Sequence, residues 1–242
     1  MAEAIIIGGF GSSPEQMHFL AERMTNHLGM DTIGINFREA SQHKKRLASF
    51  VAGKTVVTHS GGLKPLANAV KAYNSMPERL TAIAPPVPEQ IRKLLWRGAM
   101  IGLGLNGMPD FELERKVGAG DELTHHALAN FGRIPSLSSF NAMNEVADLQ
   151  RRGVETTIAF MEHDGLFDTS TESIACAVER VRQLGSRVVS IGGGHCRFTH
   201  DPLGTMSEIE QDDGFRDEGN WTREQTPQGV RHHLPTAMAG AL

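Results

Sequence analysis

The stretch VVTHSGGLKP, residues 56–65, carries the clearest indication of the fold in this sequence. Its apolar β-branched run leads into a turn of small residues, and residues 61–73 then carry apolar side chains at helical spacing. A strand, a sharp turn and a helix are therefore expected in succession, with Ser60 at the turn. A serine in this place is either a nucleophile or a small residue that a tight turn needs.

Short β-branched runs alternate with amphipathic segments on both sides of this stretch. Strands are predicted at residues 4–7, 32–37, 54–59, 80–84, 155–161 and 187–191. Helices are predicted between them, for example at residues 170–184, and Ser13 followed by Pro14 is typical of a helix start. This order favours an α/β fold with a mainly parallel sheet of about six strands and helices on both faces.

The alternation breaks at residues 87–152, where the chain is rich in Leu, Met, Phe and Gly. We expect this segment to form a mostly helical cap, inserted into a core made of residues 1–86 and 153–205. Residues 206–242 turn acidic and glycine-rich, so a loosely ordered C-terminal tail is expected there.

Length and composition are those of a globular protein with one sizeable core. The chain has 242 residues, 40% of them hydrophobic and 21% charged, and a formal net charge of −4. The negative charge argues against nucleic acid as a partner. The apolar run near the N-terminus is too short for a secretory signal or a membrane span, so a cytoplasmic protein without a membrane partner is expected.

Four of the loops that follow predicted strands carry chemically informative residues. These loops are GGFGSS, HSGG, EHDGLFD and GGGHCRFTHDP. In a parallel sheet the loops at the carboxyl ends of the strands line the ligand crevice. A serine hydroxyl becomes a nucleophile when a base takes its proton, an acid orients the base and nearby donors stabilise the oxyanion. The four loops together contain a residue of each required type.

Residues 58–62, Thr-His-Ser-Gly-Gly, are similar to the nucleophile elbow G-x-S-x-G, with Thr58 in place of the first glycine. On these loops, residues 1 to about 205 resemble the α/β-hydrolase superfamily, in the order serine, acid, histidine. The resemblance implies that the first two strands of that fold would be absent here, because the strand that carries the oxyanion loop is predicted to begin at residue 4. We expect an α/β-hydrolase fold shortened at one sheet edge.

The resemblance implies a role for one residue in each loop. Ser60 matches the nucleophile, Asp164 resembles the acid, and His195 resembles the base. The backbone N–H groups of Phe10 and Gly61 would form the oxyanion hole. No cofactor and no metal is implied, and the two cysteines of the chain lack metal-ligand spacing.

Other histidines compete for the role of base. The glycines before His195 would bring backbone close to the site, whereas His200 lies further along and is the simpler candidate for a surface residue. We interpret His59 as a structural neighbour of the elbow.

Other acids compete for the role of the orienting carboxylate. Asp164 directly follows the predicted strand, whereas Asp168 is better placed to cap the next helix. Glu162 is expected to point away, by strand alternation.

The sequence therefore predicts a carboxylesterase-like serine hydrolase. It would cleave a carboxylic ester or thioester of a small or medium hydrophobic substrate through an acyl-enzyme. One alternative is a non-catalytic ligand-binding or receptor protein on the same fold. Another is a nucleotide-binding reductase, although Pro14 stands where the dinucleotide motif has its third glycine. The expected partner is a small-molecule substrate. The sequence does not predict the oligomeric state, and a homodimer is one of the alternatives.

Overall fold

The computed structural model describes residues 3–10, 12–86, 140–162, 164, 172–195 and 197–212. Its strands are β1 (Ala4–Ile7), β2 (Thr32–Ile35), β3 (Thr55–His59), β4 (Arg79–Ile83), β5 (Glu155–Met161) and β6 (Arg187–Ile191). Its helices are α1 (Pro14–Leu28), α2 (Phe37–Gln42), α3 (Lys44–Val51), α4 (Leu63–Tyr73), α8 (Ala142–Arg151), α9 (Glu172–Gln183), α10 (Arg197–His200) and α11 (Pro202–Gln211). A short 3-10 turn, η1 (Ser60–Gly62), joins β3 to α4.

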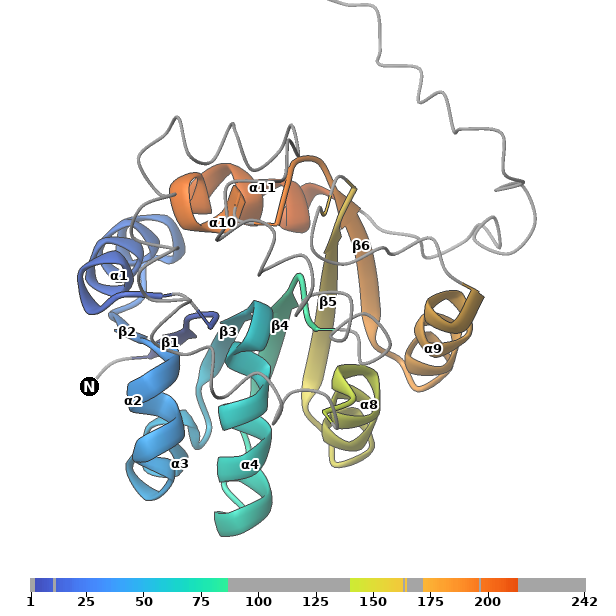
Figure 1. Cartoon of the computed structure of the whole chain (residues 1–242), viewed down its shortest axis with the longest axis horizontal. Coiled ribbons are helices and arrows are strands. Elements are labelled where there is room, and N and C mark those ends of the chain that lie inside the picture. The colour runs from blue at the N-terminus through green and yellow to red at the C-terminus, as the bar shows by residue number, and fades with distance from the viewer. Residues whose placement is uncertain are drawn as a thin grey trace, which may run out of the picture.

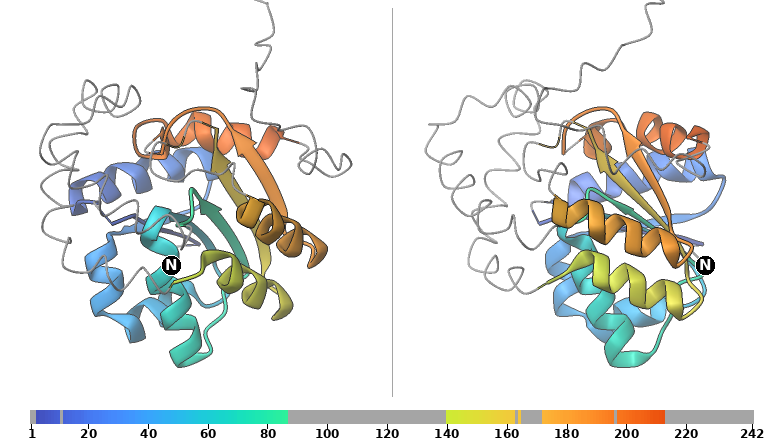
Figure 2. Two further views of the ribbon diagram at one scale, coloured as in Figure 1. Left: turned by 45° about the vertical axis from the view of Figure 1, so that its right-hand side comes forward. Right: turned by 90° about the vertical axis from the view of Figure 1, so that its right-hand side faces the viewer.

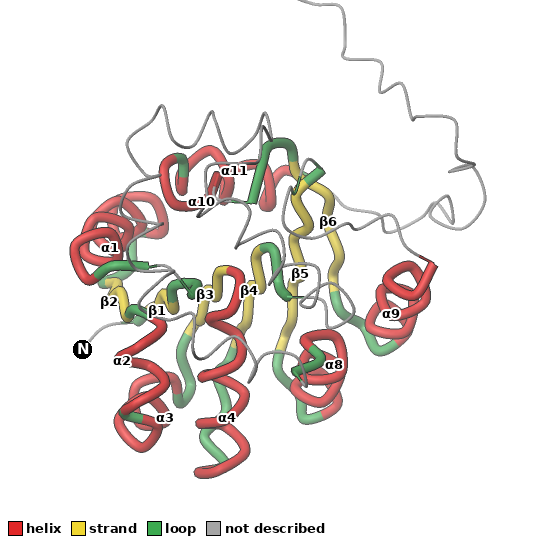
Figure 3. Tube along the Cα trace, in the orientation of Figure 1, coloured by secondary structure: helices red, strands yellow, loops and turns green. Residues whose placement is uncertain are grey.

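The strands form one six-stranded sheet in the order β2-β1-β3-β4-β5-β6. All neighbouring strands are parallel, as in the pairs β1–β3 and β5–β6. The predicted α/β fold with a six-stranded parallel sheet is confirmed. Figure 3 shows the strands side by side between two layers of helices. Since both faces are covered, β1 is buried along its whole length and reads as a continuous apolar run.

Each face of the sheet has its own helices and its own hydrophobic core. Helices α1, α10 and α11 cover one face, and α2, α3, α4, α8 and α9 cover the other (Figure 1). Alternate strand residues point to opposite faces, so Ile6 and Val57 pack with α1 and α11. Their neighbours Ile5 and Val56 pack with α3, α4 and α8.

Helix α1 begins where the sequence predicts its start. The Ser13 hydroxyl accepts a hydrogen bond from the backbone N–H of Gln16 at 3.1 Å, and Pro14 occupies the first turn. Gly29 ends the helix in the left-handed conformation, with φ 62°. The predicted helix start at Ser13 is confirmed, and it fixes the loop between β1 and α1.

The predicted cap takes in too much of the chain at its C-terminal end. Residues 142–151 form α8, which lies beside α9 on the sheet (Figure 2). Val146, Ala147 and Leu149 are buried in the same core as the strand residues. Helix α8 therefore belongs to the core, because its apolar stripe is buried on the sheet. Residues 87–139, the rest of the predicted cap, lie outside the described residues.

The prediction of a loose tail from residue 206 is wrong for its first residues. Helix α11 runs to Gln211 and buries Met206 and Ile209 against α1 and the sheet. The Arg187 guanidinium also donates hydrogen bonds to the backbone oxygens of Ile209 and Asp212. The remainder of the predicted tail, residues 213–242, lies outside the described residues. No helix in the described part of the chain is long and apolar enough to cross a membrane.

Candidate active site

The turn after β3 has the geometry of a strained elbow. Ser60 has a φ of 50°, in the left-handed region that side chains other than glycine rarely adopt. A Cβ on Gly62 would lie 2.4 Å from the backbone oxygen of Ile7, so only glycine fits at this point. The turn is therefore pressed against the end of β1, and it projects Ser60 at the carboxyl edge of the sheet.

Three of the predicted site residues form one chain of hydrogen bonds. Nε2 of His195 lies 2.8 Å from Oγ of Ser60, and Nδ1 of His195 lies 2.8 Å from Oδ2 of Asp164. The His195 and Asp164 side chains are only 6% and 2% exposed. A carboxylate accepts from Nδ1–H, which leaves Nε2 to accept the proton of the serine hydroxyl. These residues come from the loops after β3, β5 and β6, 31 to 135 positions apart in the chain.

The residue before Ser60 also reaches His195. Nε2 of His59 lies 2.8 Å from the backbone oxygen of His195, and the two rings have centroids 5.2 Å apart. The His59 side chain is buried, and this burial, together with the nearby charge of His195, lowers the pKa of His59 from 6.5 to about 3. The sequence interpretation of His59 as a neighbour of the elbow did not foresee this contact with His195.

A charged pair holds the start of the loop that carries His195. Oε1 of Glu208 accepts the backbone N–H of Gly192 at 2.7 Å, and Nη1 of Arg197 donates to the backbone oxygen of Gly192 at 2.6 Å. Arg197 and Glu208 also contact each other at 2.5 Å. Gly193 follows with a φ of 98°, which favours glycine. Both main-chain groups of Gly192 are thus satisfied by side chains from α10 and α11.

The two predicted oxyanion donors lie on adjacent segments. The backbone nitrogen of Phe10 is 3.8 Å from the point where a Cβ on Gly61 would stand. Gly9 packs closely on the elbow, since a Cβ there would be 3.0 Å from Cβ of Ser60. The Phe10 ring lies against the ring of Phe37, with centroids 4.8 Å apart. An apolar wall therefore flanks the place where the oxyanion would bind.

The rival residues are placed elsewhere or lie outside the described residues. His200 ends α10 and is half-buried, with its Nδ1 3.5 Å from the Thr199 hydroxyl. Glu162 is exposed, as strand alternation predicts. Asp168 lies outside the described residues. Among the residues that are described, it is Asp164 whose carboxylate contacts the ring of His195.

Comparison with solved structures identifies the architecture. A hydrolase from Oleispira antarctica is 10% identical and superposes with a TM-score of 0.58, over 87% of this chain and 92% of that one. The chain has the α/β-hydrolase fold. An enol-lactonase from Burkholderia xenovorans LB400 is 11% identical, with a TM-score of 0.59 and the same two coverages, 87% and 92%. A structure from a study of carboxylesterases of Nitrososphaera gargenis is 10% identical, with a TM-score of 0.55 over 87% and 92%.

Neither a family model nor a curated protein matches this sequence. The α/β-hydrolase fold accounts for the strand order and for the loops that carry Ser60, Asp164 and His195. Because the sequence identities are only near 10%, the shared fold does not show that this chain has the substrates of those proteins.

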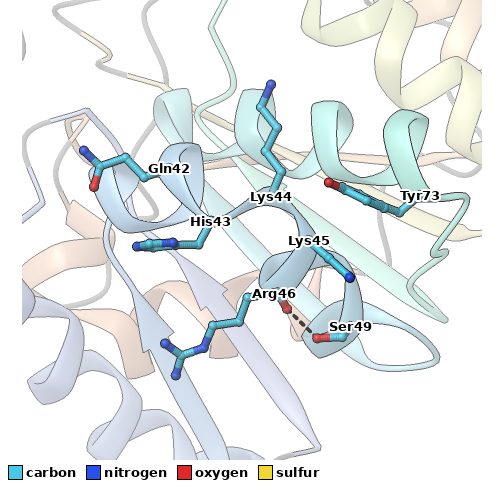
Figure 4. A pocket seen from close by; sticks show the side chains of 7 residues that line it. All are labelled: Gln42, His43, Lys44, Lys45, Arg46, Ser49 and Tyr73. Atoms are coloured by element: carbon cyan, nitrogen blue, oxygen red, sulfur yellow. Dashed lines mark hydrogen bonds between the residues drawn. The ribbon is translucent and has the colours of Figure 1, made fainter.

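Among the described residues, no group of three His, Cys, Asp or Glu side chains is placed to bind a metal ion. An open hollow lies on α3, and its lining includes Lys44, Arg46 and Tyr73 but neither Ser60 nor His195. Figure 4 shows Lys44 and Arg46 pointing to opposite sides. The Arg46 guanidinium instead lies over the ring of Phe50, at 5.1 Å from its centroid. Since the cations diverge, the hollow lacks the convergent groups of a ligand site.

Proposed function

We propose that this protein is a serine hydrolase that cleaves a carboxylic ester or thioester through an acyl-enzyme. The observation that carries the proposal is the continuous hydrogen-bonded chain from Ser60 through His195 to Asp164, built on a strained elbow. Nucleophile, base and orienting acid are each within hydrogen-bond reach of the next, which is the arrangement that activates a serine hydroxyl.

In the proposed acylation step, Oγ of Ser60 attacks the substrate carbonyl carbon and its proton passes to Nε2 of His195. Asp164 holds the ring in the required tautomer and stabilises the imidazolium that forms. The tetrahedral intermediate then collapses, and His195 gives the proton to the departing alcohol or thiol. The carbonyl oxygen becomes negative in this intermediate, and the N–H groups of Phe10 and Gly61 would donate to it.

Deacylation repeats the same chemistry with water. His195 takes a proton from a water molecule as its oxygen attacks the acyl-enzyme carbonyl. The acid product leaves, and the proton returns from Nε2 to Oγ of Ser60. Every step of this cycle uses groups of the chain itself and water.

A small or medium hydrophobic substrate fits the groups around Ser60. The rings of Phe10 and Phe37 lie beside Gly61, so an apolar acyl or alcohol group would contact carbon there. The leucine- and methionine-rich sequence of residues 87–139 points to the same class of substrate.

A panel of p-nitrophenyl esters and acyl thioesters of graded chain length tests the proposal. We expect turnover by the wild type, greatest for short or medium acyl groups, and at least about 10³-fold slower turnover by Ser60→Ala. A folded wild type that binds such compounds without turnover would favour the alternative, a ligand-binding protein on the same fold. Equal turnover by Ser60→Ala would place the reaction elsewhere.

A further inference from the structure

Two consecutive residues of the elbow, His59 and Ser60, both contact His195 on the loop after β6. Oγ of Ser60 contacts the side chain of His195, and Nε2 of His59 contacts its backbone oxygen, each at 2.8 Å. The two contacts are made at opposite ends of His195, on the ring and on the main chain. Together they define where the ring of His195 lies relative to the serine.

The chemistry of the second contact fixes the tautomer of His59. A carbonyl oxygen can only accept, so Nε2 of His59 carries the hydrogen and donates it to His195. Burial lowers the pKa of His59 to about 3, so its ring stays neutral near pH 7. His59 is thus a neutral donor over the pH range in which a histidine base works.

We infer that His59 is a positioning residue, whose Nε2–H bond to the backbone of His195 sets the distance between the base and Ser60. The inference rests on the proposed function, since it concerns the approach of the same base to the same nucleophile. His59 touches neither the substrate carbonyl nor the transferred proton in this scheme, so it acts through His195 alone.

Substitutions at His59 can distinguish the effect of its hydrogen bond from the effect of the packing of its ring. The ring lies against those of His195 and Phe198, with centroids 5.2 and 5.8 Å away. A phenyl ring fills a similar volume in these contacts but has no N–H to donate. Gln offers an amide N–H at a similar reach without the ring. His59→Phe therefore removes the bond and keeps an aromatic ring, and His59→Gln keeps a donor.

A matched destabilised control separates positioning from loss of stability. Leu149 is buried in α8, on the opposite face of the sheet from His59, and Leu149→Ala lowers stability without contact to the elbow. The experiment measures the second-order rate of fluorophosphonate labelling, together with kcat and KM for the best ester, in the wild type and the three variants. Melting temperatures of all four proteins are recorded alongside.

We expect His59→Phe to lower the labelling rate and kcat by about 10- to 100-fold with little change in KM, because a small misplacement of a catalytic group costs rates of that order. His59→Gln should recover part of this loss, and Leu149→Ala should label at the wild-type rate. A His59→Phe protein that is folded and labels as fast as the wild type overturns the inference. If the wild type itself is neither labelled nor active, the proposed function fails instead.

Discussion

Glu208 accepts the backbone N–H of Gly192 at 2.7 Å, three residues before His195. The same carboxylate contacts Arg197, which in turn donates to the backbone oxygen of Gly192. A side chain from α11 thus holds the loop that presents the proposed base. A hydrogen bond between a main-chain group and a charged side chain is stronger than one between two neutral groups.

Glu208→Ala should therefore loosen the loop and leave Arg197 without its closest carboxylate. We expect a loss of about 1–2 kcal/mol in the free energy of unfolding, a modest value because both side chains are partly exposed, and about tenfold slower ester hydrolysis. Urea denaturation and steady-state kinetics measure the two effects. Glu210→Gln is the matched control, since its carboxylate lies 3.7 Å from His27 and is 55% exposed. Equal effects of both variants would show that the contact with Gly192 does not matter.

Asp164→Asn should slow hydrolysis by about 10³- to 10⁴-fold, because an amide cannot hold His195 in the required tautomer or stabilise its charge. The melting temperature should change little, since the two side chains have nearly the same shape. Initial rates at saturating ester and a thermal melt check this pair of outcomes. Asp168→Asn is the comparison: a large loss of rate in that variant, with Asp164→Asn fully active, would show that the acid is misassigned.

The lowered pKa of His59 should decrease the free energy of unfolding at acidic pH. Its pKa is about 3 in the folded protein and 6.5 in the unfolded chain, so the unfolded state binds more protons between these values. Stability is therefore greatest above pH 6.5 and is lost as the pH falls toward 3. From pH 7 to pH 4.5 the contribution of His59 is a loss of about 2 kcal/mol.

Three other ionisable side chains, those of His195, Asp164 and His200, act electrostatically on His59. His59→Gln keeps all three, so the difference between its pH dependence and that of the wild type isolates His59. Urea unfolding at pH 7 and pH 4.5 should show a smaller loss in the variant. Parallel curves for the two proteins would mean that His59 is not buried as a neutral ring.

Thr58 stands where the elbow motif has glycine, and its side chain is only 1% exposed. It pairs with Ile7 on β1 and with the small Ala82 on β4, which leaves room for its side chain. Its hydroxyl has no hydrogen-bond partner among the described residues. An unpaired buried hydroxyl destabilises the folded state, so Thr58→Val, which keeps the shape, should raise the free energy of unfolding by about 1 kcal/mol. Guanidinium denaturation measures this change. A lower free energy of unfolding in Thr58→Val than in the wild type would show that the hydroxyl has a hydrogen-bond partner.

Shortening the C-terminus tests the corrected boundary of the tail. A protein ending at residue 212 keeps α11, with Met206 and Ile209 buried, and should melt and react like the full chain. A protein ending at residue 205 loses both side chains from the core and should unfold or aggregate, as deletions of this size cost several kcal/mol. Thermal melts of the two proteins, side by side with the full chain, decide the matter. Failure of the longer protein to fold would show that residues 213–242 support the core.

Sequence patterns predict the sheet well because they are local. The strands at residues 4–7, 155–161 and 187–191 have the bounds that the structure gives them. At β2 the prediction runs on to residue 37, but the strand ends at Ile35 and Asn36 caps α2. The apolar Phe37 extends the strand pattern in the sequence, whereas in the fold it begins a helix and packs on Phe10.

The contacts that support the site were less visible in the sequence. The order of the loops, together with the resemblance to α/β-hydrolases, points to Ser60, Asp164 and His195, because parallel strands bring their carboxyl ends to one edge. The bond from His59 to the backbone of His195 spans 136 positions and has no local signature. Glu208 lies in an acidic segment that reads as solvent-exposed, and its role depends on α11 returning to the loop after β6. Such contacts arise from tertiary packing.

Covalent labelling with a fluorophosphonate probe, read by intact mass and peptide mapping, shows whether Ser60 is an activated nucleophile. The wild type should gain one adduct per chain, located on Ser60, and both Ser60→Ala and His195→Ala should remain unmodified. No adduct on a folded, monodisperse wild type, or an adduct that persists in Ser60→Ala, would contradict the claim.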